Sequence, residues 1–249
     1  MTEETLPTRS DRVASNRRRR GRSVKLFLRD LLIIFVVAVL VSFLIKTFLV
    51  RSFYIPSASM ETTLMVNDRI IVNELEPGLI GVQHGDVVVF RDPGGWLPPV
   101  APPKSQNGFL AGIDWALSIV GLSAPDSDDH LVKRVIGLPG DHVSCCNALG
   151  QLSVNGVPLK EPYITLEPGE VDAATLHFDV TVPKGDLWVM GDNRDNSQDS
   201  SRNQNLPGKG FVPIKDVVGR AVVISWPIDR WTWLDNYPNV FRGVEDDQK

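Results

Sequence analysis

Residues that bind metal ions are scarce in this sequence, which has two cysteines and four histidines among 249 residues. Cys145 and Cys146 are adjacent, which is not the spacing of a zinc site, and no His-Glu-x-x-His pattern occurs. An EF-hand calcium loop that started at Asp195 would need glycine and glutamate where the chain has Ser200 and Leu206. We therefore expect no metal site and no cofactor. An oxidising compartment would permit a disulfide between the two cysteines, and the sequence leaves their redox state open.

Long amphipathic helices are also missing from the pattern after Met60. The chain there is a series of short runs rich in β-branched residues, which are typical of strands. Glycine, proline and asparagine separate these runs, and Asn155-Gly156 is typical of a hairpin turn. The pattern predicts a mainly β fold in which residues 51–249 form a mostly antiparallel domain. The runs are Arg69–Val72, Asp86–Phe90, Leu131–Ile136, Leu152–Val154, Asp179–Val182, Leu187–Met190 and Val217–Ser225.

The formal net charge of −4 conceals a basic N-terminus. Residues 1–30 hold nine Lys and Arg against four Asp and Glu, including the run Arg17–Arg20. The apolar stretch Leu31–Val50 follows, and its length as a helix is about 30 Å, the thickness of a bilayer core. A basic end before an apolar run is a membrane-topology signal rather than a nucleic-acid one. We expect a cytoplasmic tail at 1–30, a single-pass transmembrane helix at 31–50 and an extracytoplasmic domain at 51–249. The lipid bilayer is then a partner and nucleic acid is not.

A cleavable signal peptide is the alternative to this anchor, because it too has a basic start and an apolar middle. Ser57-Ala58-Ser59 resembles a small-residue cleavage site. It lies about nine residues past the apolar run, which is far for such a site, so the anchor is favoured.

Residues 92–129 interrupt the strand pattern. They are rich in proline and include the apolar stretch Phe109–Leu122, which is too short to span a bilayer. We interpret them as an insertion loop that either rests on a membrane surface or is simply flexible.

Ser57 and Ser59 come just after Pro56. This proline restricts its own φ angle and favours an extended conformation at Ile55. If the extended conformation continues, Ser57 and Ser59 project on the same side of the chain. A serine is a poor nucleophile without a base and an oxyanion pocket. An ordinary serine-rich loop is therefore the alternative to a catalytic one.

A candidate base is Lys133, which lies within the predicted strand Leu131–Ile136. Alternation along a strand places it on the same face as Leu131 and Val135. Burial on an apolar face lowers the pKa of a lysine and makes its neutral amine available as a base near neutral pH. The alternative is a lysine at a solvent-facing edge. The four histidines stand in no recognisable catalytic context.

Three segments together resemble the signature boxes of bacterial type I signal peptidase (leader peptidase): Pro56–Met60, Lys133–Asp141 and Gly191–Ser197. Asn67–Val72 and Gly85–Phe90 resemble the strands between these boxes. The resemblance covers most of residues 31–227. Each box alone is moderately specific, whereas all of them, in order and after an apolar anchor, are highly specific.

The resemblance implies a membrane-bound serine endopeptidase that cleaves signal peptides from exported preproteins after small residues, within a β-rich fold of the signal peptidase type. It implies that Ser59 is the nucleophile and Lys133 the general base. The Ser57 hydroxyl and the Ser59 N–H would form the oxyanion hole, and Ser197 would orient Lys133. The supporting ion-pair network would comprise Arg134, Asp192, Asp199 and Arg202. The substrate-binding pocket would be lined by Phe53, Ile55, Leu64, Leu131 and Val132.

The family pattern also sets limits on these expectations. A lysine base, where relatives of the endoplasmic reticulum have histidine, implies a bacterial cell membrane. The chain departs from the pattern Asp-Ser-Arg at Asp199-Ser200-Ser201-Arg202, and the extra residue leaves the role of Arg202 open. The insertion at 92–129 is not part of the family core.

Two other functions remain open on the sequence alone. One is a different Ser/Lys protease, such as a self-cleaving regulator that shares the β fold. The apolar anchor and the absence of a helix-turn-helix pattern before the serine argue against it. The other is a non-catalytic, membrane-anchored β domain that binds an extracytoplasmic partner, for which neither Ser59 nor Lys133 would be needed.

Overall fold

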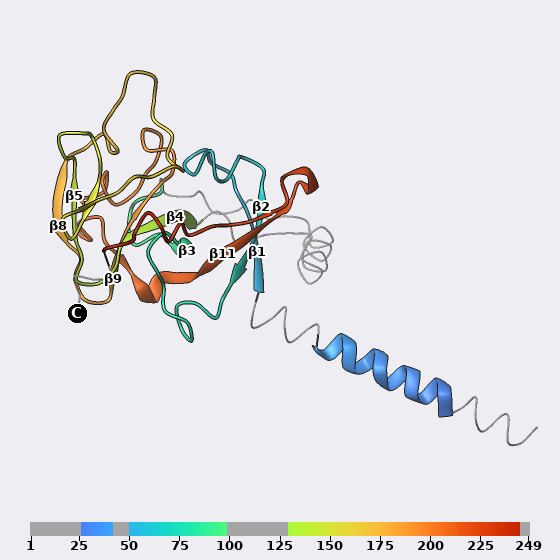
Figure 1. The fold of residues 1–249 in the computed structure, drawn as a ribbon. Helices are drawn as coiled ribbons and strands as arrows, with labels where there is room; N and C mark the ends of the chain where they lie inside the picture. Colours follow the sequence, from blue (N-terminus) through green and yellow to red (C-terminus); the bar gives the residue numbers. More distant parts are fainter. Residues whose placement is uncertain (1–25, 42–49, 99–128, 245–249) are drawn as a thin grey trace, which may run out of the picture. The chain divides into compact units, whose positions relative to one another are not determined.

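The computed structural model describes residues 26–41, 50–98 and 129–244. The chain divides into two compact units, Met1–Phe48 and Leu49–Lys249 (Figure 1). In the first unit, residues 26–41 form a helix with exposed side chains. In the described part of the chain, no helix is both long and apolar enough to cross a bilayer.

The predicted transmembrane segment 31–50 is thus described only in part. Its first residues belong to the helix, and residues 42–49 lie outside the described residues. The prediction was wrong at Val50, which is the first residue of a strand because its backbone pairs with that of Asn73 in an antiparallel ladder. Also outside the described residues are most of the predicted tail, 1–25, and most of the predicted insertion, 99–128.

The second unit contains an eight-stranded sheet in the order β1-β2-β11-β3-β4-β9-β10, with β12 paired to β11. Each of these pairings is antiparallel. The strands are β1 (Val50–Tyr54), β2 (Arg69–Asn73), β3 (Val87–Arg91), β4 (His130–Gly137), β9 (Asp186–Met190), β10 (Val212–Pro213), β11 (Val217–Trp226) and β12 (Thr232–Trp233). Two 3₁₀ turns, Ile214–Asp216 and Ile228–Arg230, flank β11.

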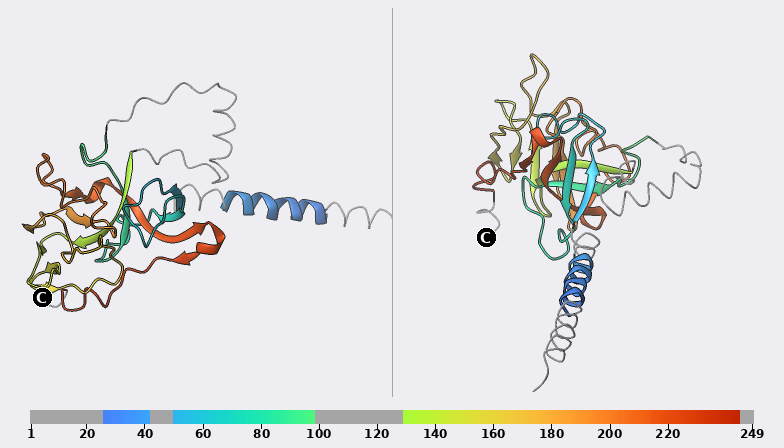
Figure 2. Two further views of the ribbon diagram at one scale, coloured as in Figure 1. Left: turned by 90° about the horizontal axis from the view of Figure 1, so that it is seen from above. Right: turned by 90° about the vertical axis from the view of Figure 1, so that its right-hand side faces the viewer.

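A four-stranded sheet has the order β7-β6-β5-β8. Asn155 and Gly156 join β6 to β7 with positive φ angles of 52° and 79°, as the hairpin prediction requires. Cys145 and Cys146 form a disulfide, which answers the question that the sequence left open. Figure 2 shows this sheet at the end of the unit that is remote from β1. Its strands are β5 (His142–Cys145), β6 (Ser153–Val154), β7 (Val157–Pro158) and β8 (Phe178–Thr181).

The mainly β, antiparallel fold is therefore confirmed, and each predicted run overlaps one of the strands. The predicted run Leu131–Ile136 lies within β4, which pairs with both β3 and β9. Alternation along β4 places Leu131 and Val135 in one apolar cluster and Ile136 in another. Lys133, which lies between Leu131 and Val135 on the same face of β4, is buried in the protein interior.

Candidate active site

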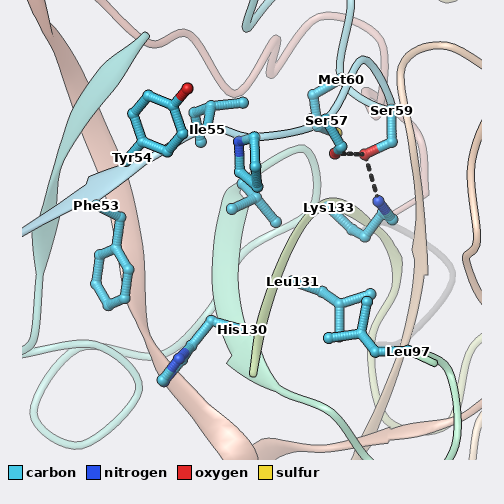
Figure 3. A pocket seen from close by; sticks show the side chains of 12 residues that line it. Phe53, Tyr54, Ile55, Ser57, Ser59, Met60, Leu97, His130, Leu131 and Lys133 are labelled. Atoms are coloured by element: carbon cyan, nitrogen blue, oxygen red, sulfur yellow. Dashed lines mark hydrogen bonds between the residues drawn. The ribbon is translucent and has the colours of Figure 1, made fainter. Parts of the chain in front are cut away.

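Ser59 and Lys133, which are 74 residues apart in the sequence, meet in the second unit (Figure 3). The Lys133 Nζ lies 2.6 Å from the Ser59 Oγ, within hydrogen-bond distance. Both residues are buried, with 3% of Lys133 and 9% of Ser59 exposed. The alternative of a lysine at a solvent-facing edge is therefore wrong. β1 delivers the serine through the segment that follows Tyr54, and β4 delivers the lysine.

Burial has a direct electrostatic consequence for Lys133. Loss of hydration disfavours the charged ammonium and lowers its pKa from 10.5 to about 8. The negative charges of Asp199 and Asp192 oppose this shift without cancelling it. A substantial fraction of the amine is thus neutral near pH 8, and a neutral amine can accept a proton from a neighbouring hydroxyl.

The second predicted hydroxyl also lies at this position. The Ser57 Oγ is 3.3 Å from the Ser59 Oγ. The extended conformation on which that expectation was based ends before Ala58, where the chain enters a turn. The turn is closed by the Glu61 N–H, which donates to the Ala58 carbonyl at 3.1 Å. It presents both hydroxyls to the same space although the strand has ended.

The loop after β9 is hydrogen-bonded to the backbone of the segment that contains Ser59. The Asn193 N–H donates to the Ser59 carbonyl at 3.2 Å, and the Asn193 Nδ2 donates to the Ala58 carbonyl at 3.2 Å. Sequence reasoning missed this role of Asn193, although the residue belongs to the Gly191–Ser197 box. An asparagine next to an aspartate reads as turn chemistry, and nothing local indicates a partner at Ala58.

Gly191 is required where it stands because of close packing. A Cβ atom on Gly191 would lie 2.3 Å from the Ser197 Oγ and 2.4 Å from the Ser59 carbonyl oxygen. These are distances that real Cβ atoms do not adopt. The loop can approach the nucleophile only because this residue has no side chain.

The Ser197 Oγ is buried and, among the residues that the structure describes, it has no hydrogen-bond partner, so the predicted hydrogen bond to Lys133 is not found there. It lies instead against Gly191, whose backbone occupies the space beside it. Ser197 thus lies in the segment that borders the dyad, and its orienting role toward Lys133 stays a prediction.

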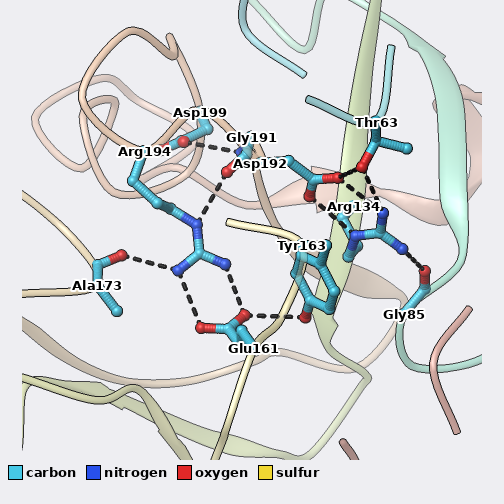
Figure 4. A network of polar contacts seen from close by, with 10 residues as sticks. All are labelled: Thr63, Gly85, Arg134, Glu161, Tyr163, Ala173, Gly191, Asp192, Arg194 and Asp199. Carbon is cyan, nitrogen blue, oxygen red and sulfur yellow. Dashed lines mark hydrogen bonds and ion pairs between the residues drawn. The ribbon is translucent and has the colours of Figure 1, made fainter. Parts of the chain in front are cut away.

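The predicted ion-pair network is centred on Arg134 and Asp192 (Figure 4). The guanidinium donates to both carboxylate oxygens, from Nε at 2.8 Å and from Nη2 at 2.7 Å. Both side chains are fully buried, and the guanidinium lies 4.1 Å from the ring centroid of Tyr163. Thr63, in the turn after Ser59, donates to Asp192 and so ties the pair to the nucleophile segment.

Asp199 belongs to a different cluster from the one predicted. It accepts hydrogen bonds from the Gly191 N–H at 3.0 Å and from the Ser201 Oγ at 2.7 Å. Arg202 donates to the Asp195 carbonyl at 2.6 Å and to the Thr175 Oγ1 at 3.3 Å. Within the described residues, the ion pairs do not include one between Arg202 and Asp199, and Ser201 takes the position beside the carboxylate instead.

A buried cluster that the sequence did not reveal lies behind this loop (Figure 4). Arg194 donates to both carboxylate oxygens of Glu161, at 2.6 and 3.0 Å, and to the Gly191 carbonyl at 2.9 Å. The Tyr163 hydroxyl donates to the same carboxylate at 2.9 Å. Glu161 carried no signal in the sequence because it stands in a plain connecting segment.

A pocket of about 210 Å³ opens beside the dyad (Figure 3). Four of the five predicted lining residues border it, and Leu64 does not, because it is fully buried in the core with Phe53 and Met60. Sequence reasoning missed Leu97 and His130 as lining residues. The full lining is Phe53, Tyr54, Ile55, Pro56, Ser57, Ser59, Met60, Leu97, His130, Leu131, Val132 and Lys133.

Within residues 26–41, 50–98 and 129–244, no group of three or more His, Cys, Asp or Glu side chains is arranged to hold a metal ion. The arrangement provides a hydroxyl, a buried amine of lowered pKa and an adjacent apolar pocket. These are the components of acyl transfer by a serine nucleophile.

Comparison with known proteins agrees with this chemistry. Residues 28–226 match the family model described as signal peptidase, peptidase S26. Signal peptidase I of Mycobacterium tuberculosis is 40% identical over 227 residues, which cover 82% of this chain and 74% of the relative. Signal peptidase I of Pseudomonas aeruginosa is 31% identical, and the alignment covers 84% of this chain and 75% of that relative. A crystal structure of a signal peptidase I from Enterococcus faecalis V583 matches with 25% identity over 56% of this chain and 95% of that one. Its TM-score of 0.35 is too low to support an argument.

Proposed function

This chain belongs to the signal peptidase family and is a serine peptidase, and we propose that it is a membrane-bound enzyme that cleaves signal peptides with a dyad of Ser59 and Lys133. The observation that carries the proposal is the buried contact of 2.6 Å between the Lys133 Nζ and the Ser59 Oγ. A lysine without a counter-charge is costly to bury in its charged form. Burial beside a hydroxyl therefore favours a role for Lys133 as a general base.

The proposed reaction begins when the neutral Lys133 amine takes the Ser59 proton as the Ser59 Oγ attacks the scissile carbonyl. The ammonium then gives this proton to the leaving amine of the mature protein, and an acyl-enzyme remains on Ser59. Lys133 next takes a proton from a water molecule as the water attacks the ester, and it returns this proton to the Ser59 Oγ when the signal peptide is released. One buried amine thus acts as base and acid in turn.

The oxyanion of the tetrahedral intermediate needs hydrogen-bond donors. We assign this role to the Ser57 hydroxyl and the Ser59 backbone N–H. The support is the position of Ser57, whose Oγ is 3.3 Å from the nucleophilic oxygen and on the pocket side of the turn. Neither donor carries a charge, so neither raises the cost of burying the lysine.

The first half of β4 offers an edge, beside the pocket, with which an extended substrate peptide could pair. In the described ladders, Leu131–Lys133 pair with β3, whereas β9 begins to pair with β4 only at Arg134. An extended peptide can therefore pair along Leu131–Lys133, opposite Ile55. Its alternate side chains would then enter the apolar pocket, which favours small residues at the first and third positions before the cut.

Membrane attachment is proposed from the N-terminal sequence. The apolar stretch 31–50 would span the bilayer once, and the basic residues before it would remain in the cytoplasm. The peptidase unit would then act on the extracytoplasmic side of a bacterial cell membrane, where signal peptides of exported preproteins emerge. The bilayer and these peptides are the proposed partners, and nucleic acid is not.

Cleavage of a preprotein by the full chain in detergent micelles tests the proposal. Ser59→Ala should lower kcat/KM by about a thousandfold or more, because the nucleophile is lost. Ser153→Ala, in β6, is the matched control and should retain activity. A Ser59→Ala variant that cleaves at the wild-type rate would favour a non-catalytic domain and reject the dyad.

A further inference from the structure

The chain makes a compact turn directly after β3, and one carboxylate organises it. The Asp92 Oδ1 accepts hydrogen bonds from the backbone N–H groups of Gly94 at 2.9 Å and Trp96 at 3.0 Å. The Asp92 Oδ2 accepts a third from the Leu97 N–H at 3.2 Å. A carboxylate that accepts several backbone N–H groups fixes the direction in which the next side chains point.

A buried indole anchors the same turn. Trp96 is 5% exposed, and its ring packs edge-on against Phe90 of β3 at a centroid distance of 5.8 Å. The next residue, Leu97, is partly buried against the cluster that contains Trp96 and Leu131. Hydrogen bonds on one side and aromatic packing on the other therefore hold Leu97 in one place.

That place is the wall of the pocket. Leu97 lines it, and Figure 3 shows its side chain near Leu131, on the Lys133 side of the pocket and away from Phe53. Leu131 and Lys133 alternate onto the same face of β4, so this side of the pocket is the one next to the reacting hydroxyl. Leu97 thus borders the space for the substrate side chain immediately before the cut.

We propose that Leu97 is a specificity-determining residue that limits the size of the substrate side chain immediately before the scissile bond, and that Asp92 is its positioning residue. The inference rests on the proposed function. The other apolar walls come from β1, from the segment after it and from β4, whereas Leu97 comes from the connection between β3 and β4. Because a methylene group of overlap or space changes recognition by about 10- to 200-fold, one leucine here is enough to exclude branched side chains.

The test uses the full chain in detergent micelles and peptides that differ only in the residue before the cut, alanine or valine. Leu97→Ala should raise the ratio of kcat/KM for valine over alanine by about tenfold or more. Leu206→Ala is the matched control, because Leu206 is partly buried in the same apolar cluster but does not line the pocket. It should leave the ratio unchanged.

Asp92→Ala should shift the ratio in the same direction as Leu97→Ala, and the double variant should shift it no further than Leu97→Ala alone. A merely structural role of Asp92 would lower both rates together and leave the ratio constant. An unchanged ratio for Leu97→Ala, with the wild type cleaving the alanine peptide, would overturn the inference and leave the proposed function intact. A wild type that cleaves neither peptide would overturn both.

Discussion

Lys133 and Arg134 are consecutive residues of β4, and both cations are buried, yet their side chains meet opposite surroundings. Arg134 donates to both oxygens of Asp192, at 2.8 and 2.7 Å. Lys133 lies against the Ser59 hydroxyl at 2.6 Å, and no carboxylate in the described structure forms an ion pair with it. Alternation along the strand separates them. Burial therefore lowers the pKa of the lysine, whereas the carboxylate beside Arg134 keeps that cation charged.

The lowered pKa of Lys133 predicts the pH dependence of cleavage. The amine must be neutral to act as a base, and its neutral fraction rises with pH through about 8. We expect kcat/KM to fall about tenfold for each pH unit below that value and to level off above it. The measurement is a pH profile with a peptide that has no titrating group near the cut. A flat profile between about pH 6 and about pH 9 would contradict a lysine base.

Removal of the buried amine should stabilise the protein while abolishing its activity. The pKa of Lys133 is lower in the folded chain than in the unfolded chain, so the unfolded chain binds more protons between about 8 and 10.5. The cost to stability is fully present below pH of about 8 and disappears as pH rises past 10.5. Lys133→Met should therefore raise the free energy of unfolding at neutral pH, by up to about 3 kcal/mol.

Urea unfolding of the full chain in micelles, followed by tryptophan fluorescence, measures this change. Lys184→Met, at an exposed position after β8, is the control and should change stability little. If Lys133→Met were no more stable than the wild type at neutral pH, the lysine would not be held in the unfavourable environment described here.

Gly191→Ala should lower kcat through a steric overlap, because no reacting group is removed. The new Cβ would come within 2.3 Å of the Ser197 Oγ and 2.4 Å of the Ser59 carbonyl, so the nucleophile segment must shift. A shift of about 1 Å in reacting atoms predicts a loss of kcat of about tenfold to a hundredfold. Gly208→Ala, where the nearest atom would be 3.7 Å away, is the comparison variant. Equal activity of the two variants would show that the close approach of Gly191 is unimportant.

Asp199 and Arg202 should respond differently to truncation. Asp199→Ala leaves the buried Gly191 N–H without its acceptor, which should cost about 1–3 kcal/mol of stability and lower kcat/KM. Among the described residues, the Arg202 side chain donates to Asp195 and Thr175, and we expect the kcat/KM of Arg202→Ala to stay within about threefold of the wild type. The test measures kcat/KM and the free energy of unfolding of both variants under the same conditions. A loss in Arg202→Ala as large as that in Asp199→Ala would restore the arginine to the network.

Local patterns determined a large part of this protein. β-branched runs between Gly, Pro and Asn turns predicted the strands, because side-chain alternation and turn geometry depend on a few neighbouring residues. The same alternation assigned Lys133 to an apolar face. Resemblance to the signature boxes then indicated Ser59 and Lys133 as a pair, although 74 residues separate them.

Only the tertiary structure decided which partners the side chains found. In the described part of the chain, Ser197 lies beside Gly191 without a hydrogen bond, Arg202 donates to the Asp195 carbonyl, and Leu97 lines the pocket from a segment outside the family boxes. These contacts depend on how loops after β3 and β9 pack against β4. A hydrogen bond forms or fails over a few tenths of an ångström, and that distance is set by the packing of distant segments, which no local sequence pattern encodes.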